Sequence, residues 1–116
     1  MYTKVLSATT VINDSVKNSA GEDLGKIEDV MLDVDNGRIS YAVLSFGGFL
    51  GVGDKLFAIP WSALDLNTEE KCFYLNVNKK QLENAPGFDK NDWPNMADPE
   101  WRRSVHDYYN VTPYQN

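Results

Sequence analysis

The sequence predicts a mainly β fold, in which antiparallel strands surround one core and a short helical extension follows at the C-terminus. Three observations predict it. The dipeptide Asn36-Gly37 joins two runs of alternating apolar residues, which is the strongest local indication of a hairpin. Gly25 lies within a strand pattern, which predicts a β-bulge or a tight bend at this position. Residues 55–60 and 72–77 are further runs of strand-forming residues.

The N-terminal part of the chain predicts an entry segment and a first hairpin. Residues 1–15 are polar and weakly patterned, although residues 7–12 have room for one helical turn. A short strand over 16–18 is followed by turn residues 19–23, where Gly21 is free to adopt a positive φ. The next strand then runs from Leu24 to Asp35.

The central hairpin follows from the turn that Asn36 and Gly37 predict. A type I′ turn at these two residues places Asp35 opposite Arg38 and fixes the register of both strands. One face of the hairpin then carries a continuous apolar stripe, formed by the pairs Val34–Ile39, Leu32–Tyr41 and Val30–Val43. We expect this stripe to face the core.

The later strands end at recognisable stop signals. Pro60 ends the strand over 55–60, and residues 61–64 then form a tight turn or short helical segment that places Trp61 in the core. Residues 65–71 are polar and turn-like. The last strand covers 72–77, with Phe73, Leu75 and Val77 as its core face, and a short helix over 79–84 follows.

The segment 46–54 is rich in glycine and has two interpretations. Its spacing is not that of a phosphate-binding loop, because no Gly-Lys-Ser/Thr ending and no helix pattern follow. It is either a plain connection between strands or an exposed apolar tip, in which Phe49 and Leu50 contact a partner.

The composition changes after Pro86, which predicts a division into residues 1–85 and an aromatic-rich extension over 86–116. Asp98 is a suitable N-cap for a helix over 99–109, on which Trp101, Val105 and Tyr108 share one face. A free helix of this length is marginal in water. We therefore expect it to dock either on the barrel of the same chain or on a second copy, with Trp101 as a contact residue.

Composition excludes several classes of protein. The formal charge of −6 over 116 residues repels phosphate backbones, so we expect no direct binding of nucleic acid. One cysteine and one histidine argue against a disulfide and against a Cys- or His-based metal site. We expect no membrane span, because no apolar run approaches the length that spans a bilayer, and we expect a cytoplasmic location by default.

Two groups of residues are candidate chemical sites. Asp29, Asp33 and Asp35 lie on one face of a predicted strand. This pattern has three interpretations: a site for a hard cation, a docking surface for a basic partner, or a face of the sheet that is simply exposed to solvent. His106 lies near Ser104, but no oxyanion hole accompanies them, and the helix C-terminus itself favours a histidine. We expect no catalytic residues, no cofactor and no metal.

Several motifs, in this order, resemble the PRC-barrel domain family. They are GEDLGKIEDV (21–30), DVDNGRI (33–39), SFGGFLGVGDK (45–55) and IPW (59–61). The family includes the cytoplasmic domain of the photosynthetic reaction centre H subunit, the C-terminal domain of ribosome-maturation proteins and stand-alone bacterial proteins. The resemblance implies a small, mostly antiparallel β-barrel without a shared catalytic residue.

The expected function is a non-enzymatic scaffold or docking module that binds a protein partner or itself, and we predict a homodimer. The alternative is a factor associated with the ribosome or RNA processing that acts through a protein partner, by analogy with the ribosome-maturation relatives.

Overall fold

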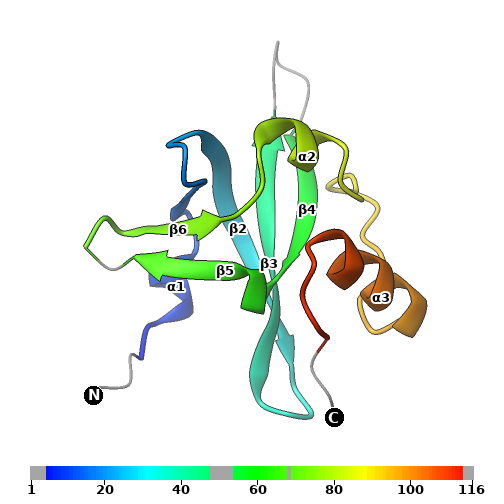
Figure 1. Cartoon of the computed structure of the whole chain (residues 1–116). Coiled ribbons are helices and arrows are strands. Elements are labelled where there is room, and N and C mark those ends of the chain that lie inside the picture. Colours follow the sequence, from blue (N-terminus) through cyan, green and yellow to red (C-terminus); the bar gives the residue numbers. More distant parts are fainter. Residues whose placement is uncertain (1–4, 48–53, 68, 114–116) are drawn as a thin grey trace.

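The computed structural model describes residues 5–47, 54–67 and 69–113. Its six strands form one sheet in the order β4-β3-β2-β1-β6-β5 (Figure 1). The strands are β1 (Ser15–Lys17), β2 (Asp23–Asp33), β3 (Arg38–Gly47), β4 (Asp54–Pro60), β5 (Leu64–Asn67) and β6 (Cys72–Leu75), and the helical elements are α1 (Ala8–Val11), the 3-10 turn η2 (Trp61–Ala63), α2 (Lys79–Glu83) and α3 (Pro99–Tyr108).

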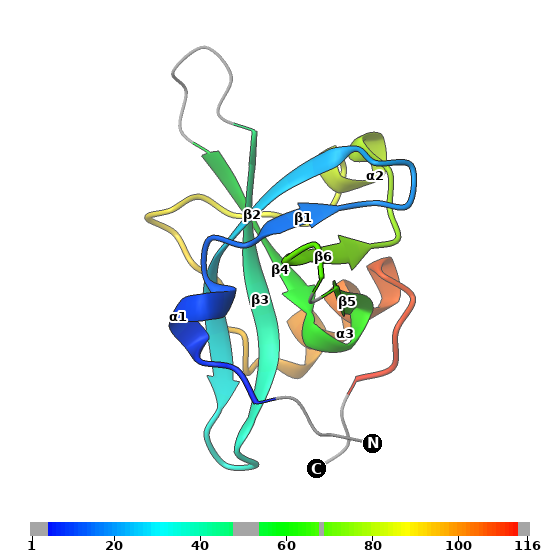
Figure 2. The ribbon, with the colours of Figure 1, turned by 90° about the vertical axis from the view of Figure 1, so that its left-hand side faces the viewer.

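The sheet is curled into a partly open barrel, which confirms the predicted mainly β fold with a short C-terminal helix. Strands β2, β3 and β4 form a long antiparallel layer, and β5 and β6 run across it (Figures 1 and 2). Only β1 and β6 pair in parallel among the strands described. The turn η2 links β4 to β5, which are the two ends of the strand order, and no ladder in the described ranges joins them.

The register of the β2–β3 hairpin differs from the predicted one. Arg38 pairs with Asp33 rather than with Asp35, because residues 34–37 form a four-residue loop. The carboxylate of Asp33 accepts hydrogen bonds from the backbone N–H and the side-chain amide of Asn36. Gly37 alone takes a positive φ in this loop, at +65°. The side chain of Asp33 thus stabilises a wider turn in which Asn36 needs no left-handed conformation.

The predicted apolar stripe is therefore wrong: none of its three pairs forms, because Leu32 pairs with Ile39, Tyr41 with Met31 and Val43 with Asp29, and its outer end is exposed. Leu32 and Val34 are 65% and 83% exposed, whereas Tyr41 and Val43 are buried. Two register shifts in the β2–β3 ladder, between Ile27 and Asp29 and between Met31 and Leu32, interrupt the strict alternation on which the stripe depended. Further along β3, residues 41–44 are all buried, so this part of the strand is covered on both faces.

Gly25 has the conformation that its place in the strand pattern predicted. Its φ is +113°, and the β1–β2 register shifts opposite it, between Val16 and Lys17. A Cβ atom at Gly25 would lie 2.1 Å from the backbone oxygen of Ser45. Only glycine fits where β2 crosses so close to β3.

The C-terminal half of the barrel contains a strand that the sequence did not indicate. Residues 64–67 were expected to lie at a turn, but they form β5, in which Leu64 and Leu66 pair with Leu75 and Phe73. A four-residue strand with only two apolar residues gives a weak periodic signal. Phe73 and Leu75 are buried, as predicted for the core face of β6. The helix α2 begins with a capping box formed by Asn78 and Gln81.

Helix α3 packs on the barrel of the same chain. Val105 and Tyr109 are buried in the same core cluster as Tyr41 and Phe57. Asp98 caps the helix as predicted. The predicted packing face is wrong at its end, because Tyr108 is 37% exposed while the next residue, Tyr109, is 8% exposed. One residue turns a helix by about 100°, so the buried face is rotated toward Tyr109. The division of the chain at residue 85 stays a prediction.

Candidate functional site: a groove beside the hairpin tip

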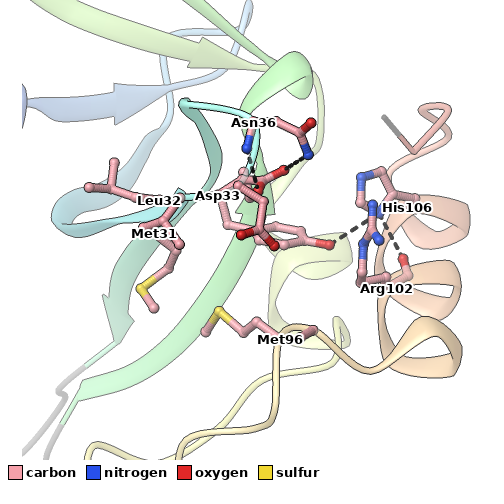
Figure 3. A pocket seen from close by; sticks show the side chains of 12 residues that line it. Met31, Leu32, Asp33, Asn36, Met96, Arg102 and His106 are labelled. Carbon is pink, nitrogen blue, oxygen red and sulfur yellow. Dashed lines mark hydrogen bonds between the residues drawn. The ribbon is translucent and has the colours of Figure 1, made fainter. Parts of the chain in front are cut away.

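A groove of about 560 Å³ lies between the tip of the β2–β3 hairpin and helix α3 (Figure 3). One wall is residues 31–36 of the hairpin, and the other is helix α3 with the loop before it, from which Arg102, His106 and Met96 project. Tyr41 and Ser40 of β3 line it between these walls. The volume falls in the range of sites that hold a small molecule or a few side chains of a partner.

The hairpin wall is held in place by Asp33. Its Oδ2 atom lies 2.8 Å from Nδ2 of Asn36 and 3.5 Å from Nε of Arg38. The backbone N–H of Gly37 donates a 2.8 Å hydrogen bond to the carbonyl oxygen of Asp33. The hydrogen bond from the Asn36 side chain, helped by the positive charge of Arg38, lowers the pKa of Asp33. This wall therefore carries a carboxylate that stays ionised at neutral pH.

Between the walls, Tyr41 is packed against side chains of α3. The ring of Tyr41 makes edge-to-face contacts with Trp101 at 5.2 Å and with His106 at 5.5 Å between centroids. Its hydroxyl lies 3.4 Å from Nδ1 of His106. Burial raises the pKa of Tyr41, while the guanidinium of Arg102 acts in the opposite direction. Tyr41 therefore keeps its hydrogen at neutral pH and serves as a rigid floor.

His106 is positioned by its own helix. Its side chain is buried, and Nδ1 lies 2.7 Å from the carbonyl oxygen of Arg102. Because a carbonyl oxygen only accepts hydrogen bonds, Nδ1 carries the hydrogen and donates it. This hydrogen bond holds the ring of His106 against Tyr41 and keeps Nδ1 from acting as a base.

The arrangement is suited to non-covalent contact. Among the described residues, Nδ1 of His106 lies near the Tyr41 hydroxyl and the Arg102 carbonyl oxygen, and neither of these groups is a serine, threonine or cysteine nucleophile. Within the ranges that the structure covers, no three residues of the types His, Cys, Asp and Glu lie close enough together to hold a metal ion. Large aliphatic side chains at the groove, Leu32 and Val34, are instead exposed to solvent.

The residues predicted to contact a partner lie elsewhere. Phe49 and Leu50 fall outside the described residues. Trp101 is half-buried against the core and does not line the groove, so its role as a partner contact stays a prediction. Among the three acidic residues noted in the strand pattern, Asp33 and Asp35 line the groove and Asp29 does not.

Several groove residues had no signal in the sequence. Arg102 and Met96 lie far along the chain from the hairpin and reach the groove only because α3 folds back onto β3. The sequence predicts His106 only as a residue near a helix end, and its burial depends on the rotated packing face of α3. Leu32 and Val34 were assigned to the core, and the hairpin register decides that they are exposed.

A model of the PRC-barrel domain matches residues 4–82 of the chain. The chain belongs to the PRC-barrel family. A comparison with curated proteins gives no match. Among the helices described, none is long and apolar enough to cross a membrane. The family match includes the hairpin wall and Tyr41 but ends before α3, so the groove lies where the PRC-barrel domain meets the C-terminal segment.

Proposed function

We propose that this PRC-barrel protein is a non-enzymatic docking module that holds a protein partner in the groove between the hairpin tip and α3. The observation that carries the proposal is the exposure of Leu32 and Val34, at 65% and 83%, at the edge of a groove with a rigid floor. Exposed aliphatic side chains around a concave site are typical of surfaces that bind other proteins. The family is compatible with such a role, since a PRC-barrel is a scaffold on which a binding surface can be built.

The docked position of α3 bears on the homodimer predicted from the sequence. One reason for that prediction was that the aromatic extension needs a surface to pack on, and its own barrel provides that surface. Self-association therefore remains a proposal that rests on the segment containing Phe49 and Leu50. Light scattering after size-exclusion chromatography separates a mass near 13.1 kDa from a mass twice as large.

Site-specific photo-crosslinking in the source cell tests the docking role. A photoreactive residue at position 34 is expected to form covalent adducts with a reproducible protein partner. The matched control places the same residue at position 83, because Glu83 is also exposed and α2 lies at the opposite end of the barrel from the hairpin tip (Figures 1 and 2). Equal adduct patterns from the two positions, or none from position 34, would show that the groove is not a docking surface.

A further inference from the structure

We infer that the groove accepts a basic amphipathic segment of a partner protein. In this arrangement an apolar side chain of the segment enters the groove beside Met31 and Met96, and a neighbouring Lys or Arg lies against the carboxylates of the hairpin tip. The inference rests on the proposed docking function and specifies the chemistry of the partner.

The apolar half of the inference comes from the two methionines and the hairpin tip. Met31 of β2 and Met96 of the loop before α3 line the groove from opposite walls, and both are partly buried against the core (Figure 3). Methionine side chains are unbranched and polarisable, so they adapt to different apolar side chains. Leu32 and Val34 add exposed aliphatic surface next to them. Such a site favours one aliphatic or aromatic side chain as its anchor.

The basic half of the inference comes from the carboxylates of the hairpin wall. Asp33 has a lowered pKa, and Asp35 is exposed at the hairpin tip. Acidic residues outnumber basic ones along the hairpin (28–40). With a formal charge of −6 for the whole chain, long-range attraction also favours a cationic partner.

The position of Arg102 gives the segment an orientation. Arg102 projects from the helix wall, opposite Asp33 and Asn36 on the hairpin wall (Figure 3), and its positive charge acts to lower the pKa of Tyr41. A basic side chain of the partner would be repelled from the helix wall and attracted to the hairpin wall. Its cationic group therefore lies on the side of Asp33 and Asp35, and its apolar anchor on the side of the methionines.

The same charges disfavour two other occupants. A second copy docked through this groove in a two-fold arrangement would bring two acidic hairpin tips together, and like charges across an interface cost binding energy. A nucleic acid would bring its phosphates against the same carboxylates. The chemistry of the groove thus selects a basic protein segment.

The test uses the full-length chain and a displayed library of random peptides. Selection on the immobilised protein is expected to enrich peptides in which an aliphatic or aromatic residue is flanked by Lys or Arg. An enriched peptide, synthesised and measured by fluorescence anisotropy, is expected to bind at least about tenfold more weakly to Asp35→Lys and to weaken with added salt. The matched control is Glu83→Lys, which makes the same charge change on exposed α2 and should leave the affinity unchanged.

The outcomes separate the partner chemistry from the docking function. Enriched peptides without basic residues, bound equally by Asp35→Lys and lost on Val34→Ser, would overturn the inference and leave the docking function standing. Peptides bound equally by Val34→Ser and the unmodified chain would overturn both. A failure to enrich any peptide, or a dimer that Val34→Ser dissociates, would also overturn the inference. Because residues 34 and 35 lie at the exposed tip, unchanged melting temperatures are expected for these variants, and Asp35→Asn replaces any that fails to fold.

Discussion

The base and the tip of the β2–β3 hairpin are built from similar alternating sequences but have different surroundings. At the base, residues 41–44 of β3 are buried on both faces, between the barrel interior and helix α3. At the tip, Leu32 and Val34 project into solvent beside the groove. The comparison teaches that an apolar pattern in a strand becomes core only where a second layer covers it, and that the uncovered end is available for binding.

The largest expected effect is at the base. Leu44→Ala removes a fully buried side chain and should lower the free energy of unfolding by about 3 kcal/mol. The matched change at the tip, Val34→Ala, should alter it by less than about 0.5 kcal/mol, because Val34 is 83% exposed. Urea denaturation followed by circular dichroism measures both. Similar losses for the two variants would mean that the tip is covered in solution.

The packing of helix α3 over the base of the hairpin can be tested by substitutions in α3. Val105 is buried against the barrel, so Val105→Ala should cost about 2 kcal/mol. Arg103 is exposed on the same helix, and Arg103→Ala should change stability by less than about 0.5 kcal/mol. Thermal unfolding followed by tryptophan fluorescence reports on both, since Trp101 packs on Tyr41. A negligible effect of Val105→Ala would place α3 away from the barrel.

A smaller effect on stability, of opposite sign, is expected at Tyr109, which follows the C-terminal end of α3. The hydroxyl of Tyr109 is buried and has no hydrogen-bond partner within the described residues, so Tyr109→Phe should stabilise the protein by about 1 kcal/mol. Tyr108→Phe is the matched control and should be slightly destabilising, because the Tyr108 hydroxyl donates to the carbonyl oxygen of Gln81. Melting temperatures measured by calorimetry show whether Tyr109→Phe stabilises the protein and Tyr108→Phe destabilises it.

Burial also raises the pKa of Tyr109 above the ordinary tyrosine value of 10.0. Above about pH 10 the unfolded chain therefore releases a proton that the folded chain keeps, and stability falls as the pH rises. Tyr109→Phe should reduce this alkaline loss. An unchanged alkaline profile would indicate that the Tyr109 hydroxyl is hydrated in solution.

The smallest effect is expected at the tip, where Asp33 organises the loop. Its pKa is lowered in the folded state, chiefly by the Asn36 side chain, so its contribution to stability is present above the unfolded pKa of about 3.8 and is lost as the pH falls through the folded value. Asp33→Asn should therefore lower the melting temperature at pH 7 more than at pH 3. Asp35→Asn serves as the control with little effect. A difference independent of pH would exclude the charge of Asp33 as the cause.

Residues with local signals were predictable, and residues placed by distant contacts were not. Gly25, Pro60 and Asp98 act through their own backbone or that of the next turn, and each was located correctly from its neighbours. The hairpin register failed because Asn36-Gly37 fits several turns, and the side chain of Asp33 selects the wider one. The turn type therefore depends on Asp33, which lies outside the Asn36-Gly37 dipeptide.

The groove was predictable only on the hairpin side. The strand pattern singled out Asp33 and Asp35 and allowed a basic partner as one of their roles. The opposite wall depends on how α3 packs, and the spacing of Trp101, Val105 and Tyr108 indicated a face that is rotated from the observed one. No pattern in the sequence relates Tyr41 to His106, which are 65 residues apart and meet only in the folded protein.

The parallel pairing of β1 with β6 has a consequence for how the chain folds. Val16 pairs with Phe73, so the N-terminal strand cannot complete its hydrogen bonding until more than half of the chain has been synthesised. The antiparallel β2–β3–β4 meander needs only short loop closures and can form earlier. A growing polypeptide that stops before Cys72 leaves one side of β1 open to other chains. Joining of β1 to β6 is therefore expected to be the late, rate-limiting event in folding, and the state that precedes it is the one most prone to aggregate.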